Sequence, residues 1–196
     1  SLRSANRTVS SSTDLRAVLR TVEWEVTLAV AQRAHDRIFV HAGAVEWKGK
    51  AILVPGRSFS GKSTLVAALV RAGAAYLSDE YAILDSSGAC HAYPRRLSLR
   101  VNGGIEQATA EDLGGRTRRE PLPVGVVVVT RYRQGATWEP SRLSAGKAVM
   151  ALLQHTVTAR ARTREVLAVL RATMLKAEAF HGVRGDAAQL VRMLLA

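Results

Sequence analysis

The residues best suited to chemistry lie in one short stretch, VPGRSFSGKST, at residues 54–64. It fits the pattern G-x-x-x-x-G-K-[ST], with Gly56, Gly61, Lys62 and Ser63 at the fixed positions. In such a loop, backbone N–H groups point at nucleotide phosphates and the helix that follows adds its positive N-terminal end. The lysine neutralises the β- and γ-phosphates, and the serine hydroxyl is placed for Mg²⁺. This stretch therefore predicts binding of a nucleoside triphosphate, taken as ATP, with Mg²⁺.

We call residues 56–64 the predicted phosphate loop. One residue in it is unusual, because Phe59 occupies a position where glycine is common. Its ring could pack on a neighbouring wall. The predicted nucleotide contacts are Gly56, Arg57, Ser58, Phe59, Ser60, Gly61, Lys62, Ser63 and Thr64.

An acidic pair, Asp79 and Glu80, follows the predicted phosphate loop. Asp79 stands 17 residues after Lys62, which leaves room for one helix and one short strand. That strand can bring a carboxylate to the metal and the γ-phosphate. One carboxylate could hold Mg²⁺ together with Ser63, and the other could accept the proton of an attacking hydroxyl. The plain alternative is a solvated pair at a strand end, and the sequence does not assign the two roles.

The spacing distinguishes classes of nucleotide-binding protein. ATP-binding-cassette and ring ATPases carry their second acidic motif much further along, and the chain contains no LSGGQ. GTPases need an N-K-x-D motif, which is also absent. Small-molecule kinases place an acid near this distance, but they usually start with the strand that leads into the loop. Here a helical segment and a hairpin come first.

The run VHAGAV…KGKAILVPGRSFSGKSTLVAALVRAGAAYLSDEYAILD, within residues 39–85, resembles the catalytic domain of HPr kinase/phosphorylase. The similarity extends to its small stand-alone relatives, the peptide serine kinases. We expect a stand-alone relative, because 196 residues leave no room for a separate regulatory domain. The family shares its core with the phosphoenolpyruvate carboxykinases, whose substrate-binding half also has no room here.

The resemblance implies particular site residues. His41 corresponds to the family's active-site histidine, and the acidic pair corresponds to one that is usually Asp-Asp. From the residues alone, His41 could equally be a core histidine hydrogen-bonded to backbone. With the resemblance, the predicted catalytic residues are Asp79, Glu80, His41 and Lys62, and the predicted metal ligands are Ser63, Asp79 and Glu80.

The elements expected around these residues form one α/β domain with a mixed β-sheet flanked by helices. We expect residues 1–13 to be a flexible N-terminus and residues 14–196 to be a single domain. A helix is predicted from Asp14 to about Asp36, followed by two strands joined at WKGK and a helix after the loop. Strands are predicted on both sides of the acidic pair, and VGVVVVTRY predicts a buried central strand.

Two longer segments have weaker patterns. Residues 94–123 are polar and rich in Gly and Arg, and they predict loops around a short helix near QATAEDL. From Ser144 onward the pattern predicts helical segments with short breaks. Arg131 and Arg133 are candidates for a phosphate contact or an exposed strand end. The Arg-rich segment GGRTRRE, residues 114–120, could be a mobile lid or, more simply, a loop whose charged side chains are solvated.

Composition narrows the partners. The net charge of +12 is dispersed along the chain and aromatic residues are only 5%, so we expect no specific nucleic-acid binding. No apolar run reaches about 18 residues, and the N-terminal stretch has no signal-peptide core, so no membrane association is expected. The single cysteine, Cys90, excludes an internal disulfide and fits a reducing cytoplasm. A homo-oligomer stays open.

Three hypotheses for function follow. The first is a Mg²⁺-ATP-dependent kinase that phosphorylates a hydroxyl, with the serine of a peptide or small protein as acceptor. The second is a small-molecule kinase on the same fold, acting for example on free serine or a natural product. The third is a nucleotide-binding module without transfer, which could lose Lys62, Ser63 and the acidic pair, all of which are present here.

Overall fold

The computed structural model describes residues 2–4, 7–10, 14–57, 60–101 and 104–196. These residues form two compact units, 1–35 and 36–196. In the first unit, β1 (Leu2–Ser4) pairs antiparallel with β2 (Arg7–Ser10), and α1 (Leu15–Arg33) is the helix predicted to follow Asp14. The predicted division into a flexible segment 1–13 and a domain from residue 14 stays a prediction.

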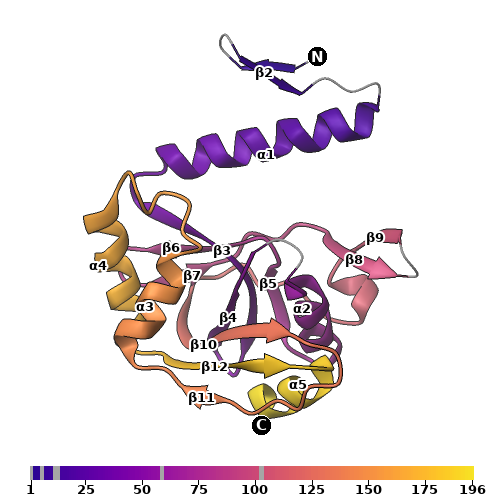
Figure 1. Cartoon of the computed structure of the whole chain (residues 1–196), viewed down its shortest axis with the longest axis vertical. Helices are drawn as coiled ribbons and strands as arrows, with labels where there is room; N and C mark the ends of the chain where they lie inside the picture. Colours follow the sequence, from indigo (N-terminus) through magenta and orange to yellow (C-terminus); the bar gives the residue numbers. More distant parts are fainter. Residues whose placement is uncertain (1, 5–6, 11–13, 58–59, 102–103) are drawn as a thin grey trace. The chain divides into compact units, whose positions relative to one another are not determined.

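The second unit is built on an eight-stranded mixed sheet (Figure 1). The strand order is β11-β12-β10-β4-β3-β6-β7, and β5 pairs with β3. β4, β10 and β12 run parallel, and the other pairings are antiparallel, which confirms the predicted mixed sheet. The strands are β3 (Arg37–Trp47), β4 (Lys50–Pro55), β5 (Ala75–Ser78), β6 (Tyr81–Asp85), β7 (Ala89–His91), β10 (Leu122–Tyr132), β11 (Ser141–Arg142) and β12 (Glu178–Arg184).

β3 is the strand around which the sheet is organised. Its second half pairs with β4 on one side and with β5 on the other, and its first half pairs with β6. The hairpin from β3 to β4 turns at Lys48 and Gly49, as WKGK predicts. Both residues have positive φ (49° and 79°), as in the type I′ turn that matches the twist of the paired strands. β7 also pairs with the start of β10, so the pairings among β10, β4, β3, β6 and β7 close on themselves.

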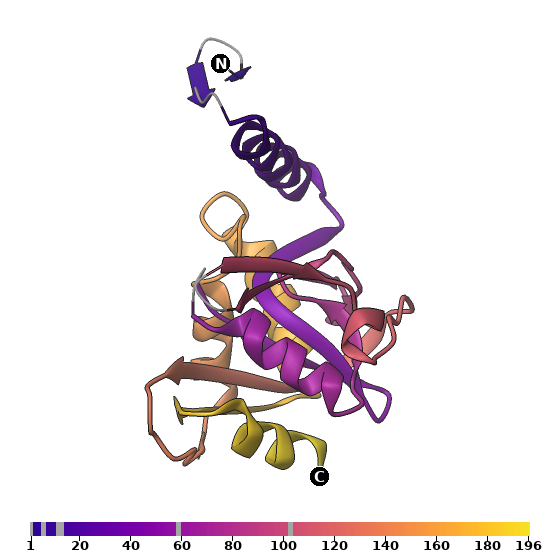
Figure 2. The same cartoon turned by 90° about the vertical axis from the view of Figure 1, so that its right-hand side faces the viewer.

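Helices cover both faces of the sheet (Figures 1 and 2). α2 (Lys62–Arg71) and α5 (Ala187–Leu195) pack on one face, and α3 (Ala145–Leu153) and α4 (Thr163–Met174) pack on the other. Neighbouring strand residues serve opposite faces, as the two-residue period of a strand requires. In β10, for example, Val127 packs with α3 and α4, and Val128 packs with α2 and α5.

The structure corrects two parts of the predicted element map. Residues 94–123 contain a hairpin of β8 (Leu97–Val101) and β9 (Gly104–Ala108), with only a 3₁₀ turn, η1 (Glu111–Leu113), beyond it. Leu97 and Leu99 are buried and alternate with exposed residues, a strand signal that the surrounding Gly and Arg obscured. The segment after Ser144 contains the strand β12 as well as helices.

Within the part of the chain that the structure describes, none of the helices is long and apolar enough to cross a membrane.

Candidate active site

β3 brings the predicted phosphate loop and the acidic pair to the same place. On one side, β4 ends beside Ala42 of β3, and the Gly56 N–H donates to the His41 carbonyl at 3.2 Å. On the other side, the chain passes from β5 to β6 at the acidic pair, and the Glu80 carbonyl accepts from the Ala42 N–H at 3.2 Å. Because both segments are anchored to the same two neighbouring residues of β3, His41 and Ala42, residues far apart in sequence converge.

The loop continues directly into α2. Gly61 is the N-cap and has a left-handed conformation (φ 84°), which favours glycine. α2 lies close to β3, because a Cβ on Gly43 would stand only 2.5 Å from Val66 Cγ2. Glycine at position 43 is therefore what lets the helix carrying Lys62 approach the sheet. Ser58 and Phe59 lie outside the described residues, whereas the other seven residues of the predicted phosphate loop are described.

Lys62 is buried, with 7% of its surface exposed, although it is a charged residue in the first turn of a helix. Its Nζ donates to the Arg57 carbonyl at 2.8 Å. Burial lowers the pKa of Lys62 to about 8, and the nearby carboxylates of Asp79 and Glu80 oppose that shift. A buried ammonium is costly unless anions compensate it, so this position is adapted to negative charge.

Asp79 faces the start of α2. The Ser63 hydroxyl donates to Asp79 Oδ2 at 3.1 Å. The Tyr76 hydroxyl lies 3.2 Å from Asp79 Oδ1 and 2.9 Å from the Arg95 carbonyl, and it can donate to either. Burial raises the pKa of Asp79, while the hydrogen bonds from Ser63 and Tyr76 favour its charged form. The carboxylate is thus held in one orientation, with one oxygen beside Ser63.

Glu80 faces a different neighbour. Its Oε2 lies 3.0 Å from Arg95 Nη1, in a half-buried ion pair. The Ser78 hydroxyl accepts from the backbone N–H groups of Glu80 and Tyr81, which fixes the turn between β5 and β6. The two acids are therefore not equivalent, since Asp79 is joined to the loop helix and Glu80 is joined to an arginine.

His41 lies at the middle of β3, beside the acidic pair. Burial, together with Lys62 and His155, lowers the pKa of His41 to about 4, so its ring is neutral at pH 7. The ring packs near Tyr81, with 5.7 Å between ring centroids. The His41 N–H donates to the His155 carbonyl at 2.7 Å. Burial also lowers the pKa of His155, and Lys62 and Arg57 add to the shift.

Four residues of this site were missed by the sequence-based interpretation. Tyr76, Arg95, His155 and Arg184 come from β5, the segment before β8, the turn after α3, and the end of β12. Arg184 Nη2 donates to the Gly61 carbonyl at 2.9 Å. Only Tyr76 could have been suspected from the chain, because it lies three residues before Asp79. The others reach the site through tertiary contacts alone.

The site's oxygen donors fit Mg²⁺. Ser63 Oγ and Asp79 Oδ2 are 3.1 Å apart, close to the spacing of about 2.9 Å between neighbouring ligands of an octahedral Mg²⁺. In the described segments, no group of three or more His, Cys, Asp or Glu side chains could hold a metal ion. Such a partial set suits Mg²⁺, which is commonly held by one or two carboxylates and completed by substrate phosphates and water.

The backbone of the Arg-rich segment 114–120 is hydrogen-bonded to β5. The Tyr76 N–H donates to the Arg116 carbonyl at 2.8 Å, and the Arg118 N–H donates to the Tyr76 carbonyl at 3.0 Å. The Arg116 side chain is largely exposed, 3.8 Å from Glu46. These contacts favour solvated loop charge over a mobile lid for this segment. Arg131 and Arg133 have exposed side chains at the end of β10.

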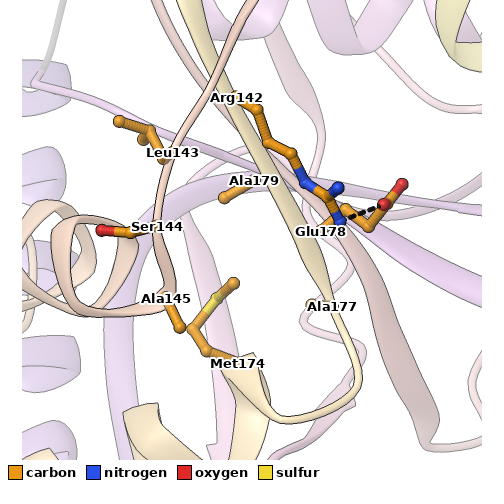
Figure 3. Close-up of a pocket in the computed structure, with 8 residues that line it drawn as sticks. All are labelled: Arg142, Leu143, Ser144, Ala145, Met174, Ala177, Glu178 and Ala179. Atoms are coloured by element: carbon orange, nitrogen blue, oxygen red, sulfur yellow. Dashed lines mark hydrogen bonds and ion pairs between the residues drawn. The ribbon is translucent and has the colours of Figure 1, made fainter.

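A pocket of about 360 Å³ lies at the other end of β12 (Figure 3). It has a mixed apolar and polar lining, and Arg142 and Glu178 form an ion pair at its rim. Since β4, β10 and β12 are parallel, this pocket and the predicted phosphate loop lie at opposite edges of the sheet. The lining residues are Arg142, Leu143, Ser144, Ala145, Met174, Ala177, Glu178 and Ala179.

Comparison with known proteins does not identify the function of this chain. No protein-family model matches the sequence, and no curated protein matches it significantly. Among solved structures, the chain is similar to the Hpr(Ser) kinase/phosphatase from Coxiella burnetii, with 10% sequence identity and a TM-score of 0.40. The similarity covers 80% of this chain and 87% of that chain. Such a distant similarity does not identify a shared activity, so the function has to be argued from the site.

Proposed function

We propose that this chain is a Mg²⁺-ATP-dependent phosphotransferase of the HPr kinase type that moves the γ-phosphate to a hydroxyl group. The acceptor we propose is the serine of a peptide or small protein. The observation that carries the proposal is the contact of Ser63 with Asp79, 3.1 Å, beside the buried amine of Lys62. A loop motif alone would suit any nucleotide-binding protein, whereas a carboxylate oriented on the loop serine suits phosphoryl transfer.

The residues divide the work as follows. Backbone N–H groups of the predicted phosphate loop and the N-terminus of α2 hold the phosphates, and Lys62 neutralises their charge. Ser63 and Asp79 would hold Mg²⁺, which neutralises charge on the transferred phosphoryl group. Glu80 has its carboxylate outside that contact, so it is the better candidate to accept the hydroxyl proton, and its ion pair with Arg95 holds it in place.

His41 supports this arrangement in its neutral form. With a pKa of about 4 it adds no positive charge near the acidic pair at pH 7, and its ring can accept or donate a hydrogen bond. In this proposal it orients the acceptor hydroxyl or Glu80. The choice of serine rests on the resemblance of residues 39–85 to the HPr kinase family. A cytoplasmic location belongs to the same proposal and rests on the single cysteine.

The test is a transfer assay with ATP and Mg²⁺, read by mass spectrometry on serine-containing peptides, free serine and water side by side. We expect a gain of about 80 Da, one phosphate, on a peptide serine, and only slow release of phosphate to water. Asp79→Asn is the matched inactive control. A gain on free serine alone would favour the small-molecule kinase. ATP binding without any transfer or hydrolysis would favour a non-catalytic nucleotide-binding module.

A further inference from the structure

We infer that Arg184 is a positioning residue for the predicted phosphate loop and that its buried charge adds to the attraction of the loop for phosphates. The inference rests on the proposed function, since it concerns how the same site binds the polyphosphate of a nucleotide. Arg184 lies more than 120 residues from the loop in sequence, and no local sequence pattern connects it with the loop.

The location of Arg184 follows from the sheet. β12 runs parallel to β10, and Arg184 pairs with Tyr132 at the ends of the two strands. β4 is the other parallel neighbour of β10 and leads into the loop. All three strands therefore end at the same edge. The Arg133 N–H donates to the Arg184 carbonyl at 2.8 Å, which fixes the backbone from which the side chain starts.

The guanidinium contacts the residue at which α2 begins. Arg184 Nη2 donates to the Gly61 carbonyl at 2.9 Å, and the Leu65 N–H of α2 donates to the same carbonyl at 3.1 Å. A Cβ on Gly61 would stand 2.5 Å from Arg184 Nη2, so the guanidinium fills the space beside that glycine. Arg184 thus holds the peptide that sets the direction of Lys62 and of the first N–H groups of α2.

The charge of Arg184 is only partly balanced by the protein around it. Its side chain is 2% exposed. In residues 36–57, 60–101 and 104–196 no carboxylate forms an ion pair with it, and its Nε has no hydrogen-bond partner. Tyr132 covers the guanidinium, 5.5 Å from the ring centroid to Cζ. Burial lowers the pKa of Arg184, and the nearby carboxylate of Asp186 opposes that shift. A buried cation with no ion-pair partner among the described residues is costly.

Two buried cations, Lys62 and Arg184, therefore flank the N-terminus of α2. The positive end of the helix adds to both. The ligand that balances this arrangement is a polyphosphate anion. Arg184 acts on it at a distance through charge and through Gly61, rather than by replacing Lys62 as a direct phosphate ligand.

The experiment compares wild type with Arg184→Gln and Arg184→Lys, with Arg192→Gln as the matched control. Arg192 is an exposed arginine of α5, eight residues further along. Calorimetry measures binding of Mg²⁺-ATP and of inorganic tripolyphosphate, at a temperature where each variant is folded. We expect Arg184→Gln to weaken both ligands about tenfold or more, because a buried charged donor is lost. Arg184→Lys should recover part of the affinity, and Arg192→Gln should change it less than about twofold.

A second measurement separates positioning from the proposed function. Hydrogen exchange of the Ser63 and Leu65 amides, in protein without ligand, should be faster in Arg184→Gln and Arg184→Lys than in wild type. If Arg184→Gln does not fold, Arg184→Lys alone decides, with an expected loss of a few fold. Unchanged affinity for both anions in the folded variants would overturn the inference. If wild type binds neither anion, the proposed function fails, and unchanged amide exchange would then overturn the positioning role as well.

Discussion

The two ends of β12 carry arginines in opposite situations. At the start of the strand, Arg142 of the neighbouring β11 pairs with Glu178 at 2.6 Å, and both side chains are largely exposed (71% and 56%) at the pocket of Figure 3. At the end of the strand, Arg184 is 2% exposed and donates to the Gly61 carbonyl, and no carboxylate of the described residues forms an ion pair with it.

The two arginines differ in how much burial affects the free energy of their charges. An exposed ion pair gains little, because water screens both partners and two long side chains lose freedom. A buried charge is costly in the free protein, so it persists where a ligand compensates it. The loop edge holds buried Lys62 and Arg184 and a desolvated Asp79, whereas the ion pair described at the pocket edge is exposed. This contrast supports the site proposed at the loop edge.

The largest effect that distinguishes the loop edge from the pocket edge is expected at Asp79. Asp79→Asn should lower turnover at least about 100-fold while ATP still binds, because the carboxylate acts on Mg²⁺ and the transferred group. Steady-state kinetics and ATP titration measure both quantities. Glu178→Gln, an exposed acid at the pocket edge, is the control and should leave turnover unchanged. Full activity of Asp79→Asn would refute its assignment.

The thermal stability of Asp79→Asn is a second test of the role of Asp79. Burial raises the folded-state pKa of Asp79, so its charged form costs stability at neutral pH, and that cost is present above its folded-state pKa. The free variant should therefore unfold at a temperature equal to or above that of wild type. A large loss of thermal stability would instead assign Asp79 a structural role.

Lys62 is the next largest effect. ATP with Mg²⁺ should stabilise wild type by about 2.7 kcal/mol at a hundredfold excess over its dissociation constant. Lys62→Ala should remove most of that gain, since it removes the buried amine of the loop, whereas Arg57, another cation of the loop, is exposed. Thermal unfolding with and without Mg²⁺-ATP measures it, with Lys147→Ala, an exposed lysine of α3, as control. Absence of an ATP-dependent shift in wild type would contradict nucleotide binding itself.

A smaller effect is expected from pH. The pKa of Lys62 in the free protein is about 8, and a bound phosphate favours its charged form and raises that pKa. Nucleotide affinity should therefore be constant below pH 8 and fall as the pH rises through 8, where binding takes up a proton. Calorimetry in buffers of different ionisation enthalpy detects the uptake. The same pH dependence in Lys62→Arg would assign the proton to another group.

The smallest effect is expected at the pocket edge. Arg142→Ala should change the free energy of unfolding by no more than about 1 kcal/mol, because the pair with Glu178 is exposed. Chemical denaturation measures it, and turnover should not change. A loss well above about 1 kcal/mol would contradict the weak contribution expected of an exposed pair.

The parts of the candidate site that lie close together along the chain could be predicted from the sequence. The loop motif, the helix after it and the acidic pair all lie within residues 56–80, and the turn at WKGK and the apolar run of β10 have strong local signals. Local patterns suffice there, because each element is built from its own backbone bonds and its own apolar period. β8 and β12 were missed, since both are short. Arg and the Gly-rich surroundings obscure the period of β8, and His and Gly interrupt that of β12.

The partner of each charged residue could be read only from the tertiary structure. Asp79 is joined to Ser63 and Glu80 is joined to Arg95, a difference that two adjacent acids cannot reveal in sequence. Arg184 belongs to the site because β12 and β4 both run parallel to β10 and end at one edge. Its burial and its contact with the Gly61 carbonyl are properties of the packed environment. Electrostatic consequences depend on distances through space, which the order of residues along the chain does not contain.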